Sequence, residues 1–292
     1  MFAFHVIERG SSHILTNKPC QDYALSHYTK DFAIGIVADG HGSDKYFRSE
    51  KGSKYAAEVT MKILHEFLAY SKNMTLLPDG DWQKQIAASI ISRWSDRIEH
   101  DKNDNPFTNE ELDLLKDADR QRVESDSWQF VYGTTLIAVV RTRKCFFGLH
   151  IGDGKCVAID VNGNPLQPIP WDDDCFLNQT TSLCDSDAIN RFRFVHMTEN
   201  LPVAAFVASD GVDDSYPTEE RLNAFYTTMW QMIQENTENA VANLQAFLPK
   251  MSEQGSHDDI SISGIINQSK KGTKYGLFGN TIKRIITKIS KS

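Results

Sequence analysis

The stretch Ala38-Asp39-Gly40-His41-Gly42 directly ends the apolar run Phe32 to Ala38, and two later stretches share this placement of acidic residues at the end of an apolar run. Ser209-Asp210-Gly211 follows the run Val203 to Ala208, and His257-Asp258-Asp259 precedes the run Ile260 to Ile266. If these runs are antiparallel neighbouring strands, the end of one lies beside the start of the next. We therefore expect Asp39, Asp210 and Asp258 to meet on one rim of a sheet.

Carboxylates that crowd together repel one another, so such a cluster usually needs cations. Hard oxygen ligands suit Mg²⁺ or Mn²⁺. The three aspartates therefore predict a metal-dependent enzyme. In isolation, each aspartate is also a common residue for a turn at the end of a strand.

The remaining pattern predicts strands and helices in separate groups. Short apolar runs indicate strands. The runs at 134–140, 145–151 and 155–161 are expected to form a meander, and further strands are expected at 192–197, 203–208 and 260–266. Apolar residues at helical spacing predict two helices within 47–98 and two more within 218–251, while 101–127 is a surface helix or a mobile excursion. Residues 165–190 are irregular and indicate a surface flap. This order favours an α+β layered fold with helices outside sheets.

Composition narrows the class of protein. The chain has 292 residues, of which 40% are apolar, enough for a real core. It has no apolar run long enough to span a membrane, and its N-terminus is too short and too polar for a signal peptide. Its five cysteines are irregularly spaced, so we expect free thiols and a cytoplasmic protein.

Charge is distributed unevenly along the chain. The net charge is −8, yet residues 268–292 hold seven basic residues and no acidic ones, which leaves residues 1–267 with a net charge of −15. An acidic body disfavours nucleic-acid binding. We expect a domain at 1–267 and a basic amphipathic tail at 268–292, which would dock on an acidic partner or on the body, or less favourably on a membrane.

Six motifs occur in an order that resembles the metal-dependent protein phosphatases (type 2C, or PPM), in a bacterial-type form. They are Gln21-Asp22, Asp39-Gly40-His41-Gly42, Gly133-Thr134-Thr135, Gly152-Asp153-Gly154-Lys155, Ser209-Asp210-Gly211 and Asp258-Asp259-Ile260-Ser261. The resemblance extends from about residue 8 to residue 266. It implies a central antiparallel β-sandwich flanked by antiparallel helix pairs, in α-β-β-α layers. It also implies hydrolysis of phosphoserine and phosphothreonine in proteins, with a cognate kinase or its targets as partners.

The resemblance also implies roles for particular residues. Asp39 would bridge two Mg²⁺ or Mn²⁺ ions, and the Gly40 carbonyl would bind one of them. Asp210 and Asp258 would hold one ion, and Asp22 would reach the other, largely through water. Such an ion pair activates a bridging water for in-line attack on the phosphate.

Two further residues take roles from the resemblance. His41 would be the general acid that protonates the leaving seryl or threonyl oxygen. Asp153 would help to hold a weaker third ion together with Asp210. For Asp153 the alternative is a plain hairpin turn, since Gly-Asp-Gly is an excellent turn sequence.

The sequence departs from the family pattern in three places. Asn17 stands where many members have an arginine that grips the substrate phosphate, so Lys18, His13 or Arg9 would have to replace it, although lysine lacks the bidentate geometry of arginine. Gly154-Lys155 replaces Ser-Arg, and Asp259 replaces Asn, without removing an expected metal ligand.

Other functions remain open on sequence alone. A non-catalytic module could keep the fold and bind a phosphoprotein or another partner. Another metallohydrolase, such as a nuclease, could use the same carboxylates, although the acidic body argues against it. A cysteine-dependent phosphatase would need a Cys-x₅-Arg motif, which the sequence lacks.

Overall fold

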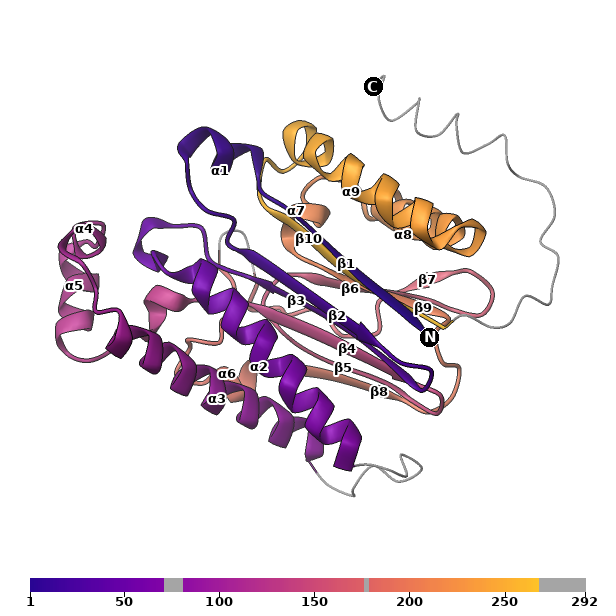
Figure 1. Ribbon diagram of the computed structural model, residues 1–292, viewed down its shortest axis with the longest axis horizontal. Helices are drawn as coiled ribbons and strands as arrows, with labels where there is room; N and C mark the ends of the chain where they lie inside the picture. The colour runs from indigo at the N-terminus through magenta and orange to yellow at the C-terminus, as the bar shows by residue number, and fades with distance from the viewer. Residues whose placement is uncertain (71–80, 176–178, 268–292) are drawn as a thin grey trace.

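Two five-stranded antiparallel sheets stack face to face between two layers of helices in the computed structural model, which describes residues 1–70, 81–175 and 179–267 (Figure 1). The first sheet has the order β1-β10-β9-β6-β7, with β1 Phe2–Glu8, β10 Ile260–Ile266, β9 Ala204–Ala208, β6 Lys155–Ile159 and β7 Pro165–Leu166. The second has the order β2-β3-β4-β5-β8, with β2 Asp22–Tyr28, β3 Phe32–Asp39, β4 Leu136–Thr142, β5 Phe146–Ile151 and β8 Arg193–Met197. The predicted α-β-β-α layering is confirmed.

Each outer layer is an antiparallel pair of amphipathic helices. The pair α2 (Ser49–Tyr70) and α3 (Trp82–Asp104) covers the second sheet, and the pair α8 (Glu219–Glu235) and α9 (Thr237–Gln254) covers the first. The apolar face of α3 carries Ile86, Ile90, Trp94 and Ile98 at intervals of four, and all four side chains are buried. Burial of such a face in a core, more than helix propensity, holds a helix in place.

Three apolar cores match the three interfaces between the four layers. One lies between the α2–α3 pair and the second sheet, one between the two sheets, and one between the first sheet and the α8–α9 pair. The middle core is built from small and β-branched residues, such as Ala33, Val37, Val139 and Val207. Small side chains there let the two sheets pack closely, and this holds the ends of their strands near each other.

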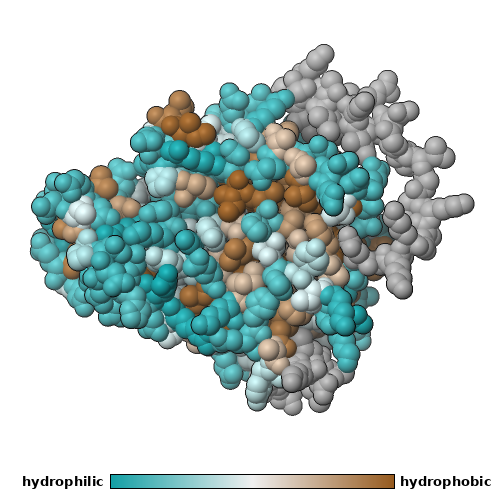
Figure 2. Space-filling view, viewed as in Figure 1, coloured by the Kyte–Doolittle hydropathy of each residue, from teal (hydrophilic) through white to brown (hydrophobic). Residues whose placement is uncertain are grey.

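Short elements complete the chain around one end of the sandwich. They are α1 (Ser11–Thr16), η1 (Asp44–Tyr46), α4 (Asn109–Leu112), α5 (Asp117–Glu124), η2 (Gln129–Tyr132), α6 (Ala188–Arg191) and α7 (Asp210–Asp213). The charged stretch 101–127 thus ends α3 and forms the two short helices α4 and α5. In Figure 2 the exposed apolar side chains of α1, Ile14 and Leu15, form a brown cap at the top left of a mostly hydrophilic surface.

Two topological expectations were wrong. Strands β9 and β10 are antiparallel neighbours, but β3 lies in the other sheet, so Asp39 approaches Asp210 and Asp258 across the sandwich rather than along one rim. The three runs at 134–161 are not a meander either, because β6 pairs with β9 in the first sheet. Gly152, with φ of +112°, turns the chain from β5 in one sheet to β6 in the other. Asp153 therefore sits on a link between sheets, not on a hairpin.

The tail at 268–292 lies outside the described residues, so its predicted docking is not addressed by the structure. Within the described part of the chain, no helix combines the length and the hydropathy needed to cross a bilayer. All five cysteines are free thiols, as expected.

Candidate metal centre and catalytic cleft

A cleft of about 1640 Å³ opens at the end of the sandwich where the sequence motifs converge. Its walls include Asp39 from the end of β3, Asp210 from the start of α7, and Asp258 from the turn before β10. Asp153, on the link between the sheets, lines the same cleft. Acidic residues separated by up to 219 positions in the sequence are thus brought into one cavity.

Asp22 lies behind these residues, directly opposite Asp39 in the β2–β3 pairing. It is almost completely buried, and its carboxylate accepts a hydrogen bond of 2.7 Å from the Ser209 hydroxyl. The hydroxyl of Ser209, which precedes Asp210, therefore links the two sheets at the base of the cleft.

Burial and mutual repulsion raise the pKa values of the acids at the cleft. Burial, followed by the charge of Asp259, raises the pKa of Asp22 to about 8, and burial, followed by Asp153, raises the pKa of Asp210 to about 7. The pKa of Asp39 is raised by burial and then by the charges of Asp22 and Asp210. Among the described residues, no lysine or arginine forms an ion pair with Asp22, Asp39 or Asp210. When these three acids ionise, their charge has no cationic partner in the described part of the chain.

The donor set fits a hard divalent cation. Asp39, Asp210, Asp258 and Asp153 offer only carboxylate oxygens to the cleft, the ligands that Mg²⁺ and Mn²⁺ prefer. A cation would also remove the repulsion that raises their pKa values.

Close backbone packing fixes the Asp39–Gly40 turn. The Gly40 amide donates to the Gln21 carbonyl at 3.0 Å, and a Cβ at this position would lie 2.6 Å from the carbonyl oxygen of Ser49. Only glycine fits between these two backbones. The Asp39 carbonyl accepts from Thr134 Oγ1 at 2.9 Å and from the Thr135 amide at 2.8 Å, so the Gly-Thr-Thr motif braces the turn.

His41 lines the cleft and is hydrogen-bonded to a neighbouring side chain. Its Nε2 lies 2.8 Å from the Ser182 hydroxyl, which in turn donates to the Thr134 carbonyl at 3.1 Å. Burial, then the charge of Lys45, lowers the pKa of His41 to about 4. The ring is therefore neutral at pH 7 in this structure. Ser182 lies in the irregular 165–190 region, which the sequence predicts only as a surface flap, so its contact with His41 was not foreseen.

The three residues expected to replace the phosphate-binding arginine are all engaged with the protein. Lys18 Nζ bonds the Gly42 carbonyl at 3.1 Å and the Asp44 carboxylate at 2.9 Å. Arg9 donates to the carbonyl of His13 at 2.9 Å. The ring of His13 contacts Asp258 and Asp259 rather than the open cleft.

Three cations that sequence reasoning missed line the cleft instead, namely Lys45 from η1, Arg122 and Arg191. Arg122 comes from α5, and Arg191 from α6, where it pairs with Asp174 and Asp187. Their elements lie far in sequence from the acidic motifs, so only the fold brings them there.

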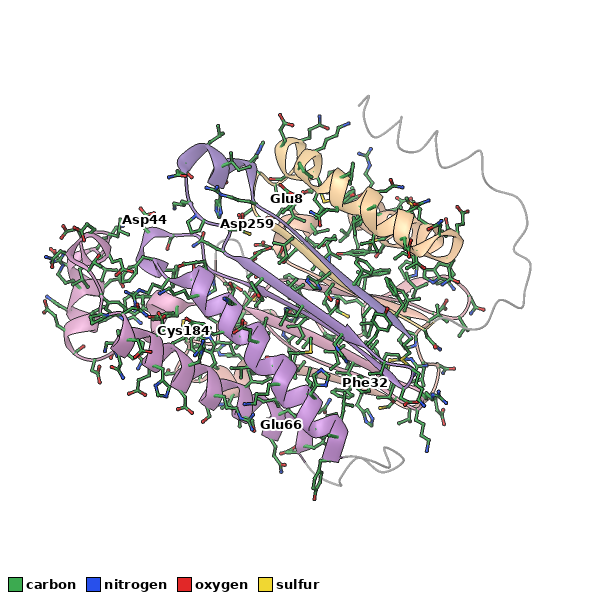
Figure 3. The ribbon with its side chains drawn as sticks, in the orientation of Figure 1. Glu8, Phe32, Asp44, Glu66, Cys184 and Asp259 are labelled. Carbon is green, nitrogen blue, oxygen red and sulfur yellow. The ribbon has the colours of Figure 1, made fainter. Side chains whose placement is uncertain are left out.

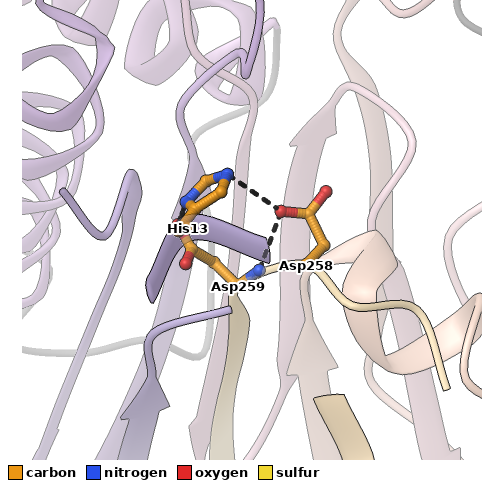
Figure 4. Close-up of side chains that lie close together, drawn as sticks. All are labelled: His13, Asp258 and Asp259. Carbon is orange, nitrogen blue, oxygen red and sulfur yellow. Dashed lines mark hydrogen bonds and ion pairs between the residues drawn. The ribbon is translucent and has the colours of Figure 1, made fainter. Parts of the chain in front are cut away.

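Asp259 is fully hydrogen-bonded and is not available to a metal. Its carboxylate accepts from the Gly10 and Gln21 amides, each at 2.6 Å, and its Oδ2 lies 3.0 Å from His13 Nδ1. Burial alone would raise its pKa, but these hydrogen bonds, led by His13, lower it. Figure 3 shows Asp259 below α1, and Figure 4 shows the ring of His13 beside the carboxylate of the adjacent Asp258, joined to it by a dashed line.

Comparisons with known proteins agree with this architecture. The sequence model of the protein phosphatase 2C family matches residues 9–249. No curated protein matches the sequence.

Solved structures resemble the fold at low identity. A bacterial serine phosphatase has a TM-score of 0.58 at 14% identity, covering 93% of this chain and 100% of its own. The Stp1 serine/threonine phosphatase of Staphylococcus aureus has a TM-score of 0.55 at 13% identity, covering 91% and 95%. The catalytic domain of the PstP phosphatase, solved with two manganese ions, has a TM-score of 0.53 at 16% identity, covering 90% and 96%.

Proposed function

Because the chain belongs to the protein phosphatase 2C family, we propose that it hydrolyses phosphoserine and phosphothreonine in proteins with the help of two Mg²⁺ or Mn²⁺ ions. The observation that carries the proposal is the set of cleft acids with raised pKa values and no cationic partner among the described residues. A purely structural cluster of buried acids would be compensated by donors or cations within the protein.

The ligands follow from the position of each acid. Asp39 would bridge the two ions with the Gly40 carbonyl beside it, Asp210 and Asp258 would hold one ion, and Asp22 would act on the other through water. Asp153 would contribute to a weaker third site. Bound ions of this kind supply an activated water and neutralise the charge of the phosphoryl oxygens.

The residues of this chain position the substrate and move the proton. His41 would donate a proton to the leaving seryl or threonyl oxygen. Since His41 is neutral in this structure, it needs the dianionic phosphate beside it to raise its pKa before it can act as an acid. Arg122 and Arg191 line the cleft and are better placed to bind phosphate than Lys18, Arg9 or His13.

The proposed catalytic unit is residues 1–267, and the partners are phosphorylated proteins, including a cognate kinase or its targets. Free cysteines throughout the chain support a cytoplasmic location.

Release of phosphate from a phosphothreonine peptide tests the proposal. With Mn²⁺ we expect turnover that EDTA abolishes and that Asp39→Asn lowers by at least about a hundredfold, the scale of removing one essential electrostatic group. Asp104→Asn, on the exposed surface of α3, is the matched control and should retain full turnover. Absence of any metal-dependent turnover in the wild type would favour a non-catalytic phosphoprotein-binding module.

A further inference from the structure

The ring of His13 is held in one orientation by acceptors on one side. Its Nδ1 lies 3.0 Å from Asp259 Oδ2 and 3.2 Å from the Pro19 carbonyl. Both neighbours act as acceptors, since the Asp259 carboxylate also receives two backbone amides. Nδ1 therefore carries a proton, and Nε2 is the one ring nitrogen that a cation could bind, in place of a proton.

Nε2 points toward Asp258 but lies too far from it for a good hydrogen bond. The side chain of His13 is nine-tenths buried, and Nε2 lies 3.5 Å from Asp258 Oδ1, beyond the usual length of an N–H···O bond (Figure 4). Two ligand atoms that share one ion at about 2.1 Å each are about 3.0–3.4 Å apart. The separation is thus close to that of two ligands of one cation.

The surroundings complete a known arrangement for metal ligands. A histidine that binds a metal usually donates its other ring N–H to a carboxylate, which fixes the tautomer and raises the basicity of the ligand nitrogen. Asp259 occupies that place, because its carboxylate contacts Nδ1 while Nε2 faces Asp258. This arrangement explains the aspartate at position 259, because an asparagine there would supply no negative charge to orient the ring of His13.

We propose that His13 Nε2 is a nitrogen ligand of the cation that Asp258 holds, and that this ligand makes the site prefer Mn²⁺ over Mg²⁺. The proposal rests on the proposed function, which makes Asp258 a metal ligand. Imidazole suits transition metals, whereas Mg²⁺ takes almost only oxygen ligands. The metal centre would then have a nitrogen ligand on the side of Asp258, whereas on the side of Asp39 its ligands would all be oxygen atoms.

Pulsed electron paramagnetic resonance of the Mn²⁺-loaded full chain tests the bond directly. We expect modulation from an imidazole nitrogen in the wild type and its loss in His13→Ala. His257→Asn is the matched control: it removes the exposed histidine next to Asp258, and asparagine tolerates the positive φ of 66° there, so the signal should remain. A wild-type spectrum without nitrogen modulation, or a signal that survives in His13→Ala, would overturn the proposal.

Calorimetric titration of the protein with Mn²⁺ and with Mg²⁺ tests the proposed preference for Mn²⁺. His13→Ala should weaken Mn²⁺ binding by at least about tenfold and Mg²⁺ binding by less than about threefold. His13→Gln, whose amide can still donate to Asp259, guards against misfolding and should show the same selective loss. An equal loss for both ions would mean that His13 only supports the turn. A wild type that hydrolyses phosphopeptide with Mn²⁺ but lacks this selectivity would overturn the role of His13 and leave the proposed function intact.

Discussion

In two clusters of acids in this protein, the pKa values shift in opposite directions. The cleft acids Asp22, Asp39 and Asp210 have raised pKa values because burial and like charges act on them together. In the second group, here called the Arg48 cluster (Arg48, Asp101, Glu111 and Tyr132), burial would also raise the pKa values of the two acids, but hydrogen bonds from Arg48, Tyr132 and neighbouring donors lower them. Burial is common to both, so the difference lies in the partners.

The Arg48 cluster is satisfied by the protein itself. Arg48 binds Glu111 through two nitrogens, at 2.7 and 2.8 Å, and its remaining nitrogen reaches Tyr132 at 2.9 Å. Asp101 accepts from Tyr132 at 2.8 Å and pairs with Lys51 at 3.0 Å. This cluster joins α3, α4 and η2 to the residue that directly precedes α2, and it needs no external cation. Among the described residues, Asp22, Asp39 and Asp210 have no cationic partner, although Asp22 accepts a hydrogen bond from Ser209. The lack of a cation distinguishes this candidate binding site from a structural ion pair.

The largest expected effect comes from breaking the satisfied cluster. Arg48→Ala would leave the largely buried Glu111 carboxylate without its cationic partner and would remove one partner of Asp101, which keeps Lys51 and Tyr132. We therefore expect a loss of about 3 kcal/mol in the free energy of unfolding, measured with urea. Arg93→Ala is the control, since its pair with Glu66 is exposed, and it should cost only about 0.2–1 kcal/mol. Similar losses in the two variants would show that the Arg48 cluster contributes little.

Mn²⁺ should stabilise the protein through the other cluster. At a free concentration of one hundred times its dissociation constant, each bound ion adds about 2.7 kcal/mol to the free energy of unfolding relative to protein in EDTA. The same increment is expected in Arg48→Ala if that variant folds, because distant sites contribute additively. An increment that disappears in this variant would show that the two clusters are not independent.

The contrast between the clusters also explains what the sequence could predict. Asp39 and Asp210 directly follow apolar runs and Asp258 lies just before one, so the convergence of these three acids was foreseeable. The layered fold was predicted from the order of the elements and from the resemblance that the ordered motifs carry. The sheet that holds each strand was not foreseeable, because apolar runs do not specify which neighbour they pair with. Strands β1 and β2 were missed as well: their termini carry no strong turn signal, and their pairing with β10 and β3 is set by tertiary contacts.

Partners contributed by irregular segments were beyond sequence reasoning. Ser182 bonds His41 from the 165–190 region, and Arg122 and Arg191 reach the cleft from short helices. The role of Asp259 was hidden too, because its three donors come from residues 238–249 positions away. Contacts of this kind depend on the closed sandwich rather than on local periodicity.

A smaller effect of opposite sign is expected in the cleft. Without metal, Asp39→Asn removes one of several mutually repelling buried carboxylates, so we expect the free energy of unfolding in EDTA at pH 8 to rise by an amount on the order of 1 kcal/mol. With saturating Mn²⁺ the variant should instead be less stable than the wild type, because it binds the ion poorly. A variant that is destabilised in both conditions would mean that the Asp39 carboxylate is already satisfied by the protein.

The smallest effect concerns the response of the Arg48 cluster to acid. The pKa of Glu111 is lowered in the folded protein, so below its unfolded value of about 4.3 the unfolded chain binds more protons than the native one. Its contribution to stability is therefore complete above that pH and is lost as the pH falls through the folded pKa. Glu111→Gln should flatten the dependence of the free energy of unfolding on pH between about 5 and 3, by at most about 1.4 kcal/mol per pH unit for one group. Asp104→Asn, on the exposed face of α3, should leave the slope unchanged. If Glu111→Gln has the same slope as the wild type, the acid sensitivity of the protein comes from elsewhere, and the two clusters differ less than their hydrogen bonds indicate.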